Sequence, residues 1–137
     1  MKINFNQNID NVTFSRGKEA KQAVSKIDFA KLEKMLGGTT KEKRLALSTL
    51  SGINKNNGNY MPGLRLLGIA LDDTIPEIRI QAANVLASFA DTTIFKNIKG
   101  SRDRFDKVLK KANGDSSKQV SNKAIEIKLR LQRYYGY

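Results

Sequence analysis

The sequence contains no cysteine and no histidine. Without cysteine the chain can form neither disulfides nor thiolate sites, and without histidine it lacks the commonest general base and the commonest metal ligand. No glycine-rich phosphate loop, nucleophile–base pair or metal-ligand spacing occurs in it either. The sequence therefore predicts a protein that is not an enzyme, with no catalytic residues, no cofactor and no metal.

Long apolar runs are also missing. Apolar residues make up 39% of the 137 residues, which is enough for the core of one small domain. No run approaches the roughly 18–20 apolar residues that a membrane span needs. The first residues, MKINFNQNIDNVTFS, hold a lysine but no apolar stretch behind it, unlike a secretory signal. We therefore expect a cytoplasmic protein without a membrane span.

Acidic residues are scarce relative to basic ones, and the formal net charge is +12. The excess is uneven, with a net charge of +6 over residues 1–55, −2 over residues 56–95 and +8 over residues 96–137. A basic balance is typical of proteins that bind an acidic or polyanionic partner. It is equally compatible with a lysine-rich surface that only keeps the protein soluble.

A helical period begins near residue 26. Residues 1–25 are polar and asparagine-rich, and they predict an extended N-terminal arm, with a short helix near residues 18–24 as an open alternative. After them, Phe29, Leu32 and Leu36 recur on one helical face. Gly37-Gly38 then ends this helix, because glycine tolerates the left-handed conformation of a C-terminal cap.

A pattern of capping box and apolar stripe then repeats along the chain. The capping box Thr39-x-x-Glu42 recurs 35 residues later as Thr74-x-x-Glu77, with Pro76 in the first helical turn. A further shift of 42 residues leads to Ser116-x-x-Gln119. The stripes that follow the second and third boxes are Ile78, Ala82, Val85 and Phe89, and Val120, Ala124, Ile127 and Leu131. The repeat predicts three helical hairpins at about residues 26–54, 61–91 and 102–133, followed by a tyrosine-rich tail at residues 134–137.

One segment permits a second interpretation. Residues 124–132, AIEIKLRLQ, alternate apolar and polar side chains as a half-buried strand does. We expect a helix there, because the repeat extends into this segment and because a lone strand among helices would have no partner.

The segment DDTIPEIRIQAANVL, residues 72–86, resembles the second half of a HEAT repeat, and especially a bacterial subtype of it. The resemblance covers about residues 26–133 and implies an all-α fold, a short right-handed α-solenoid of about three HEAT-like hairpins. In that family, an aspartate of the turn and an arginine form a ladder between successive hairpins. The resemblance assigns Asp73 and Arg79 to such a ladder, with Arg44 as the arginine of the first hairpin. Gly38 and Ser121 replace the aspartate of the first hairpin and the arginine of the third.

The resemblance also implies a function. HEAT-like solenoids bind other macromolecules along their second helices, so we expect a protein–protein interaction module or scaffold with an acidic partner. Nonspecific binding of nucleic acid through the basic surface is the alternative. Some HEAT-like proteins are DNA glycosylases, but this chain lacks the tryptophan and histidine that would stack on a base. The candidate positions on the second helices are Gln81, Asn84, Ser88, Lys123, Glu126, Arg130 and Arg133.

The last helix carries a further candidate site. Ile125 and Leu129 lie off the core stripe, at positions that match Ala83 and Ala87 of the middle hairpin. They would face the place of a fourth hairpin, whereas the end units of solenoids normally present a polar outer face. Two interpretations remain open. Either the tyrosine tail folds back over them, or this end docks a partner or a second copy of the chain as a homodimer.

Overall fold

The computed structural model describes residues 26–136, and this part of the chain contains seven α-helices and no strand. They are α2 (Phe29–Leu36), α3 (Thr40–Gly52), α4 (Tyr60–Ala70), α5 (Pro76–Ala87), α6 (Thr92–Asn97), α7 (Ser101–Asn113) and α8 (Lys118–Tyr135). The all-α class is confirmed. The N-terminal arm predicted for residues 1–25 lies outside the described residues.

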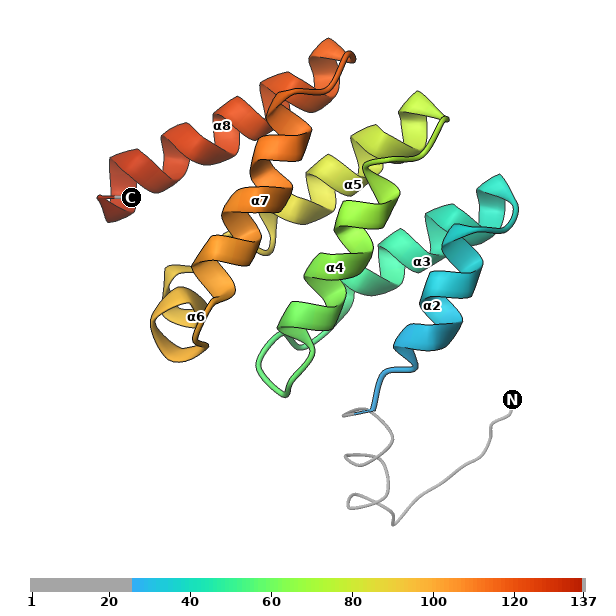
Figure 1. Cartoon of the computed structure of the whole chain (residues 1–137), viewed down its shortest axis with the longest axis horizontal. Helices are drawn as coiled ribbons and strands as arrows, with labels where there is room; N and C mark the ends of the chain where they lie inside the picture. The colour runs from blue at the N-terminus through green and yellow to red at the C-terminus, as the bar shows by residue number, and fades with distance from the viewer. Residues whose placement is uncertain (1–25, 137) are drawn as a thin grey trace.

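Apart from α6, the helices pack in pairs that form two layers (Figure 1). Each of α2, α4 and α7 packs against the helix that follows it, namely α3, α5 and α8. Between pairs, α2 contacts α4 and α4 contacts α7 in one layer, while α3 contacts α5 and α5 contacts α8 in the other. The order of the pairs in space therefore follows their order in the sequence.

The predicted apolar stripes of the second helices form the core. The four stripe residues of α5 and its C-terminal end are at most 6% exposed, and the four of α8 at most 1%. The residues are Ile78, Ala82, Val85 and Phe89, and Val120, Ala124, Ile127 and Leu131. Because α8 is helical from Lys118 to Tyr135, the strand alternative for residues 124–132 was wrong. The stripe buries one helical face, and the alternating residues lie on the others.

The middle hairpin closes tightly around Phe89. The Tyr60 hydroxyl donates a hydrogen bond of 2.6 Å to the Phe89 carbonyl, and the two rings lie 5.2 Å apart. A Cβ atom at Gly63 would lie only 2.9 Å from Cζ of Phe89. Glycine at this position therefore permits the close approach of α4 to the end of α5.

The turns differ from the predicted capping boxes in two of three cases. Thr39 and Glu42 form the predicted reciprocal box at the start of α3. The boxes predicted at Thr74–Glu77 and Ser116–Gln119 were wrong, because the N-cap residues are Ile75 and Ser117, and neither has a side-chain cap. An aspartate organises each of these turns instead. Asp73 accepts a hydrogen bond from the Ile75 amide, and Asp115 accepts one from the Ser117 amide.

The lengths of these turns also change how the first hairpin aligns with the second. The second helices begin at Thr40, Pro76 and Lys118, so they are spaced by 36 and 42 residues rather than by 35 and 42. The turn before α3 is shorter than the turn before α5, and the single offset of 35 does not hold across it. The residue of α3 that corresponds to Arg79 is therefore Lys43, not Arg44.

Two further features depart from the prediction. The short helix α6 lies between the second and third hairpins, capped by Asp91, whose carboxylate accepts from the amides of Thr93 and Ile94. The tyrosine-rich tail predicted at residues 134–137 begins within α8, because this helix continues to Tyr135. Gly136 then ends the helix with a left-handed φ of 65°. In the described part of the chain, no helix combines the length and the apolar character of a membrane span.

Candidate functional site

Ion pairs join the successive hairpins at their turns. The Nζ atom of Lys43 lies 2.8 Å from Oδ2 of Asp73, and the Nε atom of Arg79 donates to Oδ2 of Asp115 at 2.9 Å. Arg79 also donates from Nη1 to the Asp73 carbonyl. Asp73 and Arg79 thus each make an ion pair with a residue of a neighbouring helix pair. Arg44 is exposed, and Lys43 makes the contact predicted for it.

Each junction uses one cation and one carboxylate. The first hairpin supplies only the cation, Lys43, and the third supplies only the carboxylate, Asp115. Gly38 and Ser121 take part in neither of these two ion pairs.

The Asp73 carboxyl makes the stability of the first junction depend on pH. Burial raises the pKa of Asp73, but hydrogen bonds from Lys43 and from the Ile75 amide, together with the charges of Lys43 and Arg79, outweigh burial and lower the pKa. Since the folded pKa is below the unfolded value of about 3.9, Asp73 stabilises the fold above that pH. This stability is lost as the pH falls through the folded pKa.

We therefore expect the Asp73→Asn variant to be less stable than the wild type near neutral pH and to lose less further stability on acidification. Urea unfolding at about pH 6 and about pH 3 measures the two free energies of unfolding. An equal loss on acidification in both proteins would contradict the assignment to Asp73.

The candidate positions on the second helices occupy one surface of α5 and α8. Gln81, Asn84 and Ser88 correspond to Lys123, Glu126 and Arg130 through the offset of 42 residues. Several of these side chains are engaged within the fold. In the second hairpin, Gln81 donates to the Arg44 carbonyl, and Ser88, which follows α5, donates to the Val85 carbonyl. Those of α8 include Lys123, which lies 3.5 Å from Glu126, and Arg130, which donates to the Ala87 carbonyl. Asn84 and Arg133 are exposed. The surface is therefore mixed rather than a continuous basic stripe.

The outer face of α8 is apolar at its centre. Ile125 is 46% exposed and Leu129 is 53% exposed, whereas the counterpart of Ile125 in the middle hairpin, Ala83, is fully buried. Both line a shallow hollow together with Asn122, Glu126, Arg130, Arg133 and Tyr134. The fully buried Leu86 has the exposed Lys128 as its counterpart. The outer side of α8 is thus polar at Lys128 but still apolar at Ile125 and Leu129.

Tyr134 does not fold back over this face. It belongs to α8, and the residue is 66% exposed. Within residues 26–136, Ile125 and Leu129 remain open to solvent. We call Ile125, Leu129 and the side chains around the hollow the α8 outer face.

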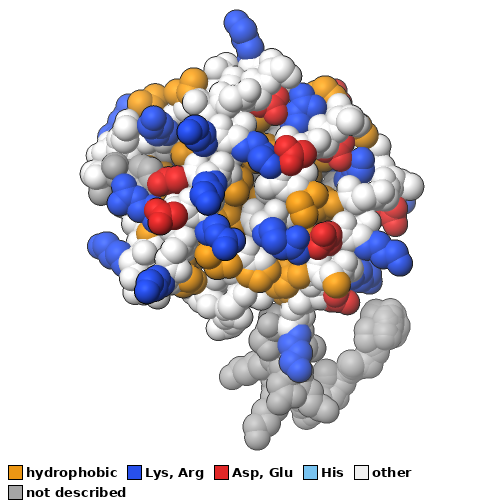
Figure 2. All heavy atoms as spheres, in the orientation of Figure 1, with side chains coloured by type: hydrophobic (Ala, Val, Ile, Leu, Met, Phe, Trp, Pro, Cys, Tyr) orange, Lys and Arg blue, Asp and Glu red, His pale blue; other side chains and the backbone are white. Residues whose placement is uncertain are grey.

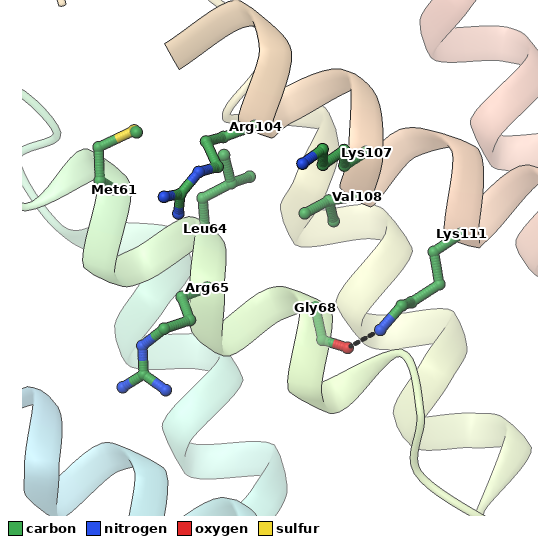
Figure 3. Close-up of a pocket in the computed structure, with 8 residues that line it drawn as sticks. All are labelled: Met61, Leu64, Arg65, Gly68, Arg104, Lys107, Val108 and Lys111. Atoms are coloured by element: carbon green, nitrogen blue, oxygen red, sulfur yellow. Dashed lines mark hydrogen bonds between the residues drawn. The ribbon is translucent and has the colours of Figure 1, made fainter. Parts of the chain in front are cut away.

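A second surface, which the sequence did not predict, is a groove between α4 and α7 (Figure 3). Its floor is formed by Met61, Leu64, Gly68 and Val108, and its margins by Arg65, Arg104, Lys107 and Lys111. Figure 2 shows this layer of the molecule, on which Lys and Arg side chains are interspersed with acidic and apolar ones. Three cations, Arg104, Lys107 and Lys111, are spaced so that they lie on one face of α7. This spacing was the signal in the sequence that could have indicated the groove.

Comparison with known proteins gives no match: the chain fits no protein-family model, and neither the curated proteins nor the solved structures contain a significant relative. Among residues 26–136, no three His, Cys, Asp or Glu side chains are grouped so that they could hold a metal ion.

Proposed function

We propose that the chain is a short right-handed α-solenoid of three HEAT-like hairpins that acts as a non-catalytic protein–protein interaction module. Support for the architecture comes from the two-layer packing of the pairs and from the ion pairs Lys43–Asp73 and Arg79–Asp115 at their junctions. Stacked hairpins of this kind expose an extended surface along one set of helices and one free face at each end.

The observation that carries the functional proposal is the exposure of Ile125 and Leu129 on the α8 outer face. Completing the burial of two half-exposed aliphatic side chains contributes about 1–1.5 kcal/mol each. Hydrophobic residues at the centre of a patch with a polar rim are the usual arrangement at protein interfaces. The α8 outer face therefore fits a protein partner with an apolar side chain or stripe.

The charges around the hollow favour an acidic partner over a second copy. Arg130 and Arg133 line the hollow beside Ile125 and Leu129, against the single carboxylate of Glu126. A second copy docked on the same face would bring the same cations close together, and like charges at an interface disfavour association. A partner that presents carboxylates around its apolar contact would pair with them.

The test is capture of partners by the tagged full-length chain, with and without nuclease, using wild type, Ile125→Lys/Leu129→Lys and Leu45→Lys. Leu45 is the matched control, because it is 58% exposed in the first hairpin. We expect wild type and Leu45→Lys to retain the same proteins after nuclease treatment and the double variant to lose them, with the melting temperature unchanged. Retention by the double variant would refute docking at the α8 outer face.

Light scattering after size exclusion addresses the second copy in the same experiment. The proposal predicts a monomer for wild type and for the double variant. A wild-type dimer that becomes a monomer in the double variant would show that the α8 outer face is a homodimer interface instead.

Nucleic acid is the alternative partner, favoured by the net charge of +12. If it binds through α8, the affinity should fall steeply with salt, because each neutralised phosphate releases counterions. Replacing Lys123, Arg130 and Arg133 by alanine should then flatten this slope. Since Lys123 and Arg130 are already engaged with Glu126 and with the Ala87 carbonyl, we expect little change. A flattened slope would favour nucleic acid over protein as the partner.

A further inference from the structure

We propose that the groove between α4 and α7 binds an acidic, amphipathic polypeptide segment. The groove combines an apolar floor with cationic margins, and the residues come from two different hairpins (Figure 3). It lies in the layer of the first helices and shares no residue with the α8 outer face. The two sites can therefore be tested separately.

The free cations of the groove come from α7. Arg104 and Lys107 are exposed, and neither has an ion-pair partner among residues 26–136. Their side chains extend from α7 toward α4 in Figure 3. Two cations on successive turns of one helix face attract carboxylates that are spaced in the same way on a partner.

The other two cations show which chemical groups this surface accepts. Lys111 donates to a carboxylate oxygen of Asp72 at 2.7 Å and to the Gly68 carbonyl at 3.2 Å. Arg65 donates to a carboxylate oxygen of Glu33 at 2.7 Å. Carboxylates of the chain thus already pair with Lys111 and Arg65, and a partner's carboxylates would pair with Arg104 and Lys107.

The floor requires that the partner also carry apolar groups. Met61, Leu64 and Val108 line it, and a Cβ atom at Gly68 would point toward Val108 at 3.8 Å, so a long side chain at this position would extend into the groove. The volume of about 210 Å³ is below the roughly 300–1,000 Å³ of sites that enclose a small-molecule ligand. Apolar side chains inserted from a helix or extended segment fit such a groove.

The same residues disfavour a nucleic acid as the occupant. Single strands bind by stacking their bases on aromatic side chains along a basic groove, and among residues 26–136 no aromatic side chain lines this one. Phosphates could pair with Arg104 and Lys107, but nothing polar in the floor would contact a base. A polypeptide with carboxylates and apolar side chains uses both parts of the groove.

The experiment uses fluorescent peptides of about 15 residues, or about four helical turns. The first has leucines at i, i+3 and i+7 spacing with glutamates elsewhere. One twin replaces the glutamates by lysine, and another replaces the leucines by glutamine. A fluorescent single-stranded oligonucleotide of thymidines is the fourth probe. Anisotropy reports binding of each probe to the full-length chain.

We expect the acidic amphipathic peptide to bind most tightly and Arg104→Glu or Lys107→Glu to weaken it by at least about tenfold. Lys110→Glu is the matched control. It changes the net charge equally on the same helix, but Lys110 lies away from the groove, beside Asp106 and Asn113. Equal weakening by Lys107→Glu and Lys110→Glu would show bulk attraction and overturn the proposal.

A second variant fills the groove without changing the charge. Gly68→Met should abolish peptide binding, whereas Gly52→Met, at a helical glycine with open space around it, should not. Circular dichroism confirms that both variants fold. Unchanged binding by Gly68→Met, equal binding of the glutamine twin, or tighter binding of the oligonucleotide would each overturn the proposal. The variant Ile125→Lys/Leu129→Lys should bind this peptide as wild type does, so failure here and failure at the α8 outer face remain distinguishable.

Discussion

Replacing Arg79 by alanine is expected to lower the free energy of unfolding by about 2–3 kcal/mol. The guanidinium joins the second and third hairpins through Asp115 and also donates to the Asp73 carbonyl. Without it, Asp115 keeps a carboxylate whose side chain is only 8% exposed and has lost its cation. The loss is smaller than for a fully buried pair because the Arg79 side chain is itself 14% exposed.

Arg44→Ala provides the matched control for this prediction. Arg44 is the residue that the sequence repeat aligned with Arg79, but it is exposed, and Lys43 makes the ion pair with Asp73. We expect Arg44→Ala to change the free energy by less than about 0.5 kcal/mol. Urea unfolding measures both variants. Equal losses at the two arginines would contradict the register of the first hairpin.

Introducing a charge at Ala82 should have the largest effect of any single substitution considered. Ala82 is fully buried on the stripe of α5, between the layers. An aspartate there would have no cation or hydrogen-bond donor prepared for it, so it would either stay charged in an apolar environment or fold protonated. We expect a loss of about 3–5 kcal/mol, the cost of an uncompensated buried charge.

Asn84→Asp places the same side chain on the same helix at an exposed position. We expect its melting temperature to stay close to that of the wild type, while Ala82→Asp melts far earlier or does not fold. A neutral result for Ala82→Asp would mean that the face of α5 assigned to the core is not buried.

The sequence predicted the helical faces well because burial requires apolar side chains at a fixed spacing. The stripes of α5 and α8 are buried as predicted, and AIEIKLRLQ is helical because Ala124, Ile127 and Leu131 belong to such a stripe. Ile125 and Leu129 were also placed correctly outside it. These predictions depend only on the geometry of a single helix.

The errors arose where the result depended on contacts between helices or on competing local hydrogen bonds. Thr74-x-x-Glu77 matches the sequence pattern of a capping box. In the structure, however, the Asp73 carboxylate accepts a hydrogen bond from the Ile75 amide, and α5 begins at Pro76. The single offset of 35 residues then assigned Arg44 to a contact that belongs to Lys43. The repeat spacing could not show the length of each turn.

Other features could not be predicted from the sequence because they depend on how whole hairpins pack together. The groove between α4 and α7 combines Met61 and Leu64 with Arg104 and Lys107, residues about 40 positions apart that no local pattern connects. The short helix α6 was missed because its six residues are too few to show a period. Its signal was Asp91 before two threonines, an N-cap pattern that also occurs in turns.

The most direct test of the central claim, that the α8 outer face is an open apolar surface, is the solvent accessibility of its methyl groups. Methyl NMR spectra with a soluble paramagnetic agent report this accessibility residue by residue. We predict that Ile125 and Leu129 broaden as strongly as the exposed Leu45, while Ile127 and Leu131 of the same helix, at most 1% exposed, stay sharp. Protection of Ile125 and Leu129 equal to that of Ile127 and Leu131, at every protein concentration, would show that the chain itself covers this face and would contradict the account.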